Sequence, residues 1–183
     1  VMGKIPDVEK TVSSDIKREG SYLYLVGKTD SGMGGSTYFD VNGLVGNDVP
    51  KVDLEILPVT LQAVHHAILT GEVFSCHDVS EGGIIGAVSE MAFGGDCGIE
   101  LDLEPGIERP DMFLFNETAG TFVVEVKNPD MATIMFGHLP HIKLGKTTAQ
   151  KRISAKVGDS DLFSIPTDEL KQAWQEPMRK VFK

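Results

Sequence analysis

The sequence is poor in cysteine and tryptophan and has no long apolar run. Its two cysteines, Cys76 and Cys97, lie in separate segments without CxxC spacing, which favours free buried thiols over a disulfide, a metal site or a nucleophile pair. No apolar stretch approaches the ~20 residues needed to span a bilayer, and the N-terminus lacks the basic and then apolar order of a secretory signal. We therefore expect a cytoplasmic protein.

Basic residues are also in the minority. The chain has 17 Lys and Arg against 27 Asp and Glu, a formal net charge of −10. Nucleic acid and anionic membrane surfaces carry the same sign of charge, so neither is expected as a partner. A chain of 183 residues can bury one core but is short for two, and we predict a single domain over residues 1–183.

The hydrophobic pattern predicts a mixture of strands and helices. Strands are expected at residues 21–27, 73–77, 98–103, 121–126, 141–146, 152–157 and 162–165, and helices at 53–70, 83–93, 129–136 and after Thr167. The polar turn TTAQ suggests that the fifth and sixth strands form a hairpin. Thr167 is expected to cap the last helix, Pro177 to disturb it and Trp174 to dock it on the core. The strands are too many for a helical bundle and too irregular for a βαβ repeat, so we predict an α+β fold, a mixed β-sheet flanked by helices.

One turn, between the predicted strand at 73–77 and the helix at 83–93, combines acidic, hydroxyl and glycine residues. Its candidate ligands or caps and its two glycines are Asp78, Ser80, Glu81, Gly82 and Gly83. Such a turn can hold a phosphate or a metal at the start of a helix. It can equally be an ordinary strand-to-helix junction, in which Ser80 or Asp78 caps the helix and the glycines serve packing.

Two further loops carry similar chemistry. The loop KTDSGMGGSTYF contains Gly34, Gly35 and Ser36, and the triplet NET comprises Asn116, Glu117 and Thr118. The first loop could cradle a ligand or simply cross the surface. Glu117 could contact a ligand through metal or water, or brace the following strand through a backbone hydrogen bond. Because buried polar loops need partners, we expect all three loops to converge at one end of the sheet.

Five stretches of the chain together carry a resemblance to a known family. They are LYLVGKTDSGMGGSTYF, GLVGNDVPKVDLE, HDVSEGGIIGAVSEMAFGG, LFNETAGTFVVEV and ELKQAWQEPMRKVF. This combination resembles the C-terminal domain of aminoimidazole ribonucleotide synthetase and its relatives, in particular the last domain of phosphoribosylformylglycinamidine synthases. Residues 1–20 resemble the stretch that follows the preceding domain in that family. The resemblance implies a fragment that begins with a linker or edge segment.

The resemblance also implies a function. The complete enzyme is an ATP-dependent ligase of purine biosynthesis that joins formylglycinamide ribonucleotide and glutamine-derived ammonia into formylglycinamidine ribonucleotide. It uses ATP and Mg²⁺, and its implied partners are the upstream domains, a glutaminase subunit and a small accessory subunit. The metal and catalytic groups belong to upstream domains. For this chain alone we therefore expect no catalytic residue, no tightly bound cofactor and no activity.

Two departures from the family pattern favour a non-catalytic pseudo-site. Asn116, Glu117 and Thr118 stand where the first, catalytic copy of the domain carries an ESQ-like triplet. Gly32 and Met33 replace an acidic residue and a leucine before the GGS motif. The alternatives are a related ATP-using synthetase domain and a non-enzymatic scaffolding module. A missing neighbour would leave an apolar patch that favours self-association, and segments 1–5 and 21–27 are the expected sites of that patch.

Overall fold

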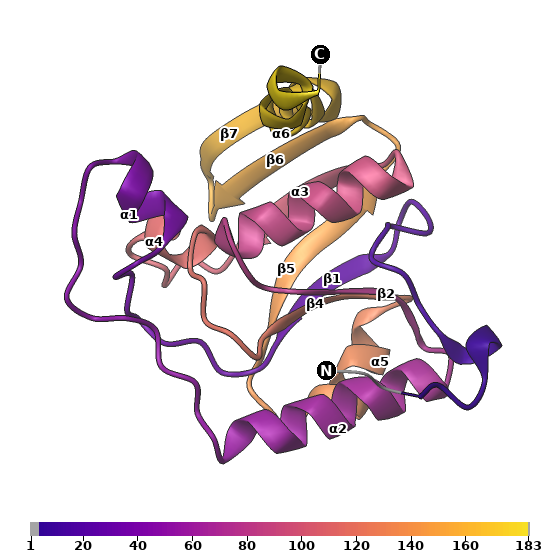
Figure 1. Ribbon diagram of the computed structural model, residues 1–183. Coiled ribbons are helices and arrows are strands. Elements are labelled where there is room, and N and C mark those ends of the chain that lie inside the picture. Colours follow the sequence, from indigo (N-terminus) through magenta and orange to yellow (C-terminus); the bar gives the residue numbers. More distant parts are fainter. Residues whose placement is uncertain (1–3, 183) are drawn as a thin grey trace.

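The computed structural model describes residues 4–182, which form a seven-stranded mixed sheet with helices packed against it (Figure 1). The predicted α+β class is confirmed. The strands are β1 (Tyr22–Val26), β2 (Val73–Asp78), β3 (Gly98–Leu103), β4 (Phe122–Val126), β5 (His141–Thr148), β6 (Arg152–Val157) and β7 (Ser160–Pro166). The helices are α1 (Thr37–Val41), α2 (Ile56–Leu69), α3 (Gly83–Gly95), α4 (Pro110–Leu114), α5 (Pro129–Phe136) and α6 (Thr167–Val181), with a short 3₁₀ helix at Val8–Lys10.

The strand order is β2-β4-β1-β5-β3-β6-β7, and it corrects the predicted hairpin. Strand β5 pairs with β1 and β3, while β6 lies parallel to β3 and antiparallel to β7. Strand β3 is thus inserted between the two strands that were expected to pair. The insertion depends on Gly98, because a Cβ there would lie 1.5 Å from the carbonyl oxygen of Gln150 in the β5–β6 connection. Hydrophobic alternation identifies a strand but not its neighbours.

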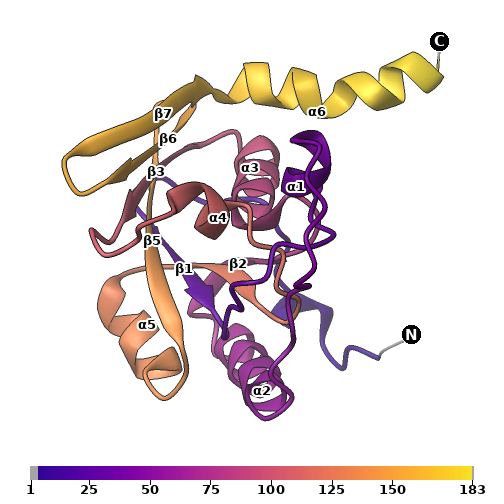
Figure 2. The ribbon, with the colours of Figure 1, turned by 90° about the vertical axis from the view of Figure 1, so that its left-hand side faces the viewer.

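Alternate residues of the central strand β1 face two separate cores. Leu23 and Leu25 point into a cluster with α3, whereas Tyr24 and Val26 point into a cluster with α2 and α5. Helix α3 therefore covers one face of the sheet, and α2 and α5 the other (Figures 1 and 2). The prediction that segment 21–27 forms an exposed apolar patch is therefore wrong, because helices cover both faces of this central strand. Of segment 1–5, Ile5 is exposed and residues 1–3 lie outside the described part of the chain.

Several helix ends differ from the sequence prediction. Helix α2 begins only at Ile56, after Asp53, whose carboxylate accepts the N–H groups of Glu55 and Ile56 at 3.0 and 3.1 Å. Thr167 is the first residue of α6 and follows Pro166, so it is not the cap. The helix continues through Pro177 to Val181. The two five-residue helices α1 and α4 were not predicted, because five residues show no clear period.

Candidate functional site

The three polar loops meet at the carboxylate of Glu117. Its Oε1 atom accepts the backbone N–H of Thr37, at the start of α1, at 3.0 Å and that of Gly82, before α3, at 2.9 Å. These contacts join segments that are 80 and 35 residues away from Glu117 in sequence. The structure therefore brings together the GGST loop, the SEGG turn and the NET triplet, as predicted.

The start of α3 is organised differently from either sequence interpretation. Gly82 occupies the position before the helix with φ 81°, and no side chain caps α3 locally. Neither Ser80 nor Asp78 is the cap, and both residues are exposed. Glu117 supplies the carboxylate from another loop, where its charge also suits the positive end of the helix dipole. The predicted local cap is wrong because the acceptor comes from a distant segment.

Glycine at positions 34 and 83 is explained by contacts within the protein. Gly83 has φ 69°, and a Cβ there would lie 2.5 Å from the carbonyl carbon of Phe115. Its N–H donates to Ser80 O at 3.0 Å, and the N–H of Gly34 donates to Asp48 O at 2.8 Å. Gly35 differs, since it has φ 77° and open space where a Cβ would be. Of these glycines, Gly35 alone presents an exposed backbone.

The hydroxyl and amide groups of the site also bind within the chain. Ser36 is buried, and its Oγ accepts from Phe39 N at 3.3 Å as the cap of α1 and donates to Met33 O at 2.7 Å. Asn116 is buried as well, and its Nδ2 donates to Asp30 O at 2.6 Å. Thr118 Oγ1 accepts the N–H of Asp30 at 3.0 Å. Asn116 and Thr118 thus fix Asp30 against the α4–β4 connection, whereas the contacts of Ser36 stay within its own segment.

A polar chain missed by the sequence analysis runs beside the site. Glu90 accepts from Trp174 Nε1 at 3.2 Å and lies 3.3 Å from His77 Nε2, so it connects α6, α3 and β2. His77 Nδ1 lies 2.7 Å from Asp78 O. The HDVSEGG motif draws attention to His77, but no local pattern indicates that Glu90, on the next helix, is its partner.

A second missed contact holds α1 to α4. Asp111 accepts two hydrogen bonds from Arg109, at 2.9 and 2.7 Å, and one from Tyr38 at 2.9 Å. The guanidinium of Arg109 holds the pKa of Asp111 well below its usual range, and the Tyr38 hydroxyl adds to this effect. Tyr38 also stacks on Phe115, with ring centroids 4.7 Å apart. The contact places α1 at the edge of the site.

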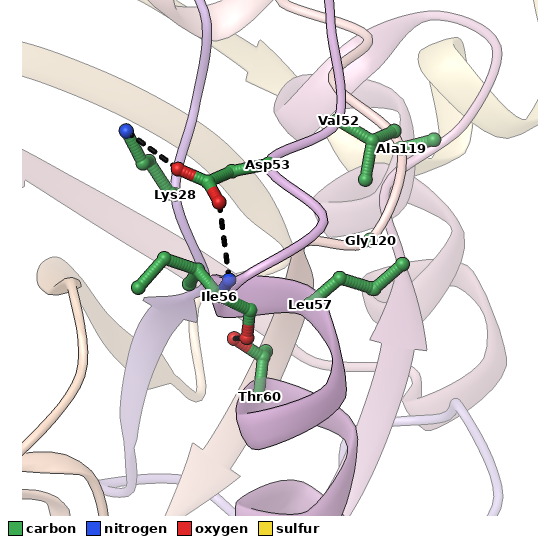
Figure 3. Close-up of a pocket in the computed structure, with 8 residues that line it drawn as sticks. All are labelled: Lys28, Val52, Asp53, Ile56, Leu57, Thr60, Ala119 and Gly120. Carbon is green, nitrogen blue, oxygen red and sulfur yellow. Dashed lines mark hydrogen bonds and ion pairs between the residues drawn. The ribbon is translucent and has the colours of Figure 1, made fainter.

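Two adjoining hollows open beside the converged loops. The first, of about 350 Å³, lies between α3 and α6 and the starts of α1 and α3. The second, of about 580 Å³, lies over α1 and the loop that follows it. Thr37 lines both. A third hollow, of about 370 Å³, includes Arg109 and Asn116. The hollow around Lys28 and Asp53 (Figure 3) holds only about 10 Å³, far below the ~300 Å³ of a small-molecule site.

The electrostatics of the first hollow disfavour a bare anion. Its lining includes the carboxylates of Glu81 and Glu90 and no lysine or arginine. Within residues 4–182, no group of three or more His, Cys, Asp or Glu side chains could hold a metal ion. A phosphate ligand in this hollow would need cations that its lining does not supply. No helix in the same residues is long and apolar enough to cross a membrane.

The sequence match assigns the chain to a protein family. Residues 18–158 match the family described as AIR synthase related protein, C-terminal domain, and the chain belongs to this family.

The most informative curated relatives are PurL subunits of phosphoribosylformylglycinamidine synthase. Those of Synechocystis and Aquifex aeolicus are both 31% identical to this chain and match 100% and 98% of it, respectively. The chain spans about a quarter of their length, 25% in each case.

Solved structures show the same fold. Thermotoga maritima PurL complexed with FGAR superposes on 89% of this chain and 30% of its own, with a TM-score of 0.74 and 17% identity. The hydrogenase maturation protein HypE covers 84% of this chain and 55% of its own, with a TM-score of 0.59 and 14% identity. The fold is therefore shared by proteins with different names and roles.

Proposed function

We propose that this chain is the C-terminal domain of a PurL-type phosphoribosylformylglycinamidine synthase subunit, a cytoplasmic enzyme. In such a protein residues 1–183 form one domain, with residues 1–20 as the segment that leads in from the preceding domain. The family membership, together with matches that run through nearly the whole chain in PurL subunits, supports this assignment. The reaction, which converts formylglycinamide ribonucleotide and glutamine-derived ammonia, belongs to the complete enzyme.

Solved structures of T. maritima PurL support a proposal for the nucleotide and the partners. T. maritima PurL has been solved with ATP, ADP and AMPPCP, and a PurLQS assembly is known from the same organism. We propose that the complete protein uses ATP with Mg²⁺ and associates with a glutaminase subunit and a small accessory subunit. The isolated chain holds neither ATP nor Mg²⁺ tightly.

We further propose that this domain lies in the non-catalytic half of the enzyme. The observation that carries this proposal is the engagement of Glu117, whose Oε1 atom already accepts two backbone N–H groups. The N–H of Gly82 is thereby occupied by an internal carboxylate, and those of Gly34 and Gly83 by internal carbonyls. Phosphoryl transfer needs free donors and cations aimed at the reacting group. Loops whose polar groups already bind one another are better suited to supporting the fold than to catalysing a reaction.

Three measurements test the proposal. The purified chain should release no phosphate from ATP in the presence of Mg²⁺, formylglycinamide ribonucleotide and ammonia, and titration with AMPPCP should give no heat of binding. Turnover by the isolated chain would contradict its expected inactivity. The non-catalytic assignment itself is tested by E117A in the complete protein, which should lower stability and leave turnover unchanged, and a loss of turnover without a loss of stability would contradict it.

The family assignment needs a separate test. The A. aeolicus PurL subunit should lose activity when its last quarter is removed, and fusion of this chain in its place should restore turnover. A matched control fuses the equivalent domain of HypE, which shares the fold, and should restore nothing. A chimera that folds cooperatively yet stays inactive, or a HypE fusion that is equally active, would count against the assignment and favour a scaffolding module.

A further inference from the structure

Helix α6 begins against the body of the protein and then runs past it. Leu170 packs beside the core that α3 covers, and Trp174 lies next to Phe93 of α3, with ring centroids 6.0 Å apart. The C-terminal half of α6 projects away from the sheet, and the helix ends at the far edge of the molecule in Figure 2. We call residues 175–182, which follow Trp174, the arm.

The arm is apolar on one face and basic beside it. Met178, Val181 and Phe182 are 60%, 71% and 74% exposed, and their spacing places them along one side of the helix. Lys180 pairs with Glu176 at 2.9 Å, whereas Arg179 contacts the neutral Gln175 at 2.7 Å. The charge of Arg179 is therefore not offset by this partner.

The two adjoining hollows form an acceptor of complementary character. We call their shared surface the trough, which consists of the residues that line the hollows of about 350 and 580 Å³ and meet at Thr37. Leu170 and Trp174, from the part of α6 before the arm, form one wall of it. Its apolar members include Phe93, Leu44 and Val45, and Val45 is fully exposed. Its acidic members are Asp40, Glu81 and Glu90. The trough is thus apolar and negative where the arm is apolar and positive.

We propose that the arm of one copy lies in the trough of a second copy, in a reciprocal two-fold dimer. The arm of a second copy suits the trough because Arg179 of the arm and Glu81 of the trough carry opposite charges. The arm is a straight continuation of α6 that leaves the body (Figure 2), so it does not turn back into its own trough. A two-fold axis makes each contact twice, which is the commonest way for one chain to satisfy two complementary surfaces. This inference concerns the chain itself and is independent of the proposed enzyme.

The size of the two surfaces limits the expected affinity. Each contact between one arm and one trough would bury about 600–800 Å² in total, and the two-fold dimer makes this contact twice, so it buries about 1,200–1,600 Å², the lower part of the standard size for specific complexes. Because area alone does not fix affinity and each contact rests on three apolar side chains, we expect a reversible dimer that a concentration series resolves.

Sedimentation velocity over a concentration series measures this dimer directly. M178E places a charge in the middle of the apolar face and should raise the dissociation constant about tenfold or more, since burial of one Met side chain is worth at least that factor. The matched control is I134E on α5, where Ile134 is 72% exposed and lies outside arm and trough. The control should dimerise like the wild type. Circular dichroism confirms that both variants keep their helices.

A charge exchange tests the pairing itself. E81K and R179E each place like charges against one another in a pair of identical copies, so each variant alone should sediment as a monomer. An equimolar mixture restores one opposite-charge contact and keeps the other unchanged, so the mixture should dimerise again. Dimers of either variant alone, with affinity equal to the wild type, would exclude this pairing. A wild-type monomer at every concentration would overturn the proposal and assign the arm to another partner.

Discussion

The carboxylate of Glu117 lies 2.9 Å from the backbone nitrogen of Gly82, 35 residues earlier in the chain, and binds the start of α3 from outside. The same oxygen accepts the N–H of Thr37 at 3.0 Å. A single side chain therefore holds the starts of two helices, α1 and α3, at one position. The polar loops resemble loops that bind a ligand, but the acceptor that they bind here is a side chain of the protein itself.

Replacement of Glu117 should show this structural role. E117A leaves two N–H groups without their acceptor and should lower the free energy of unfolding by about 1–3 kcal/mol. E117Q should lower it less, because the amide oxygen can still accept a hydrogen bond. Urea denaturation measures both, with E81A on the exposed side of the same turn as the control, expected within about 0.5 kcal/mol of wild type. Equal stability of E117A and E81A would contradict the role.

Glu125 on β4 has a comparable role in the interior. It is fully buried and accepts from the N–H of Lys17 at 2.9 Å and of Arg18 at 3.3 Å, and from the hydroxyls of Ser21 and Ser75 at 2.5 and 2.8 Å. It thereby fixes the segment before β1 to the sheet.

We expect E125A to cost about 3 kcal/mol or more of unfolding free energy, because several buried donors lose their acceptor and each such loss costs about 1–3 kcal/mol. Hydrogen exchange at the amide of Lys17 should accelerate in the same variant. The control is E100A, since the side chain of Glu100 is 45% exposed and pairs with Lys146 at 3.0 Å, and its cost should stay below about 1 kcal/mol. Unchanged protection at Lys17 would show that the segment is held by other contacts.

Glu117 and Glu125 show which features of this protein could be predicted from the sequence and which could not. The positions of the strands and long helices and the convergence of three loops were predictable, because hydrophobic period and polar composition are local properties. The partners were not, because Glu117, Glu125 and Glu90 each act on segments far away in sequence. The insertion of β3 between β5 and β6 was missed for the same reason. In the sequence, Gly83 suggests a backbone that approaches a ligand. In the structure, glycine is required there because a Cβ would collide with the backbone of Phe115.

The two thiols should differ in reactivity. Burial raises the pKa of Cys76 to about 12, whereas Cys97 is shifted upward without such a large change. The thiolate is the reactive form, so at pH 8 only about one Cys76 in ten thousand carries it. We expect a disulfide reagent to modify Cys97 first and Cys76 only after urea is added, with mass spectrometry of peptides as the readout. Rapid modification of native Cys76 would contradict its burial.

The same shift predicts a loss of stability at high pH. The half-buried thiol of Cys76 favours the neutral form, so the folded protein holds a proton that the unfolded chain releases above its ordinary pKa of ~8.5. The contribution of Cys76 is present below that pH and is lost as pH rises toward the folded value of about 12. C76A, which creates a small cavity, should be less stable at pH 7 but should show a weaker decline between pH 8 and 10. An identical decline in both proteins would assign it to other groups.

Asp111 should give the opposite dependence at low pH. Arg109 and the Tyr38 hydroxyl lower the pKa of Asp111 in the folded state, so the carboxylate contributes stability above its ordinary pKa of ~3.9, which is lost as pH falls below it. The Asp111 side chain is 34% exposed, so solvent screening limits this contribution to less than about 1 kcal/mol. D111N should lower the free energy of unfolding slightly at pH 7 and flatten its decline between pH 5 and 3. The control is D161N on the exposed strand β7, which should leave the profile unchanged. If D111N declines as steeply as the wild type, the contact between α1 and α4 does not depend on this charge.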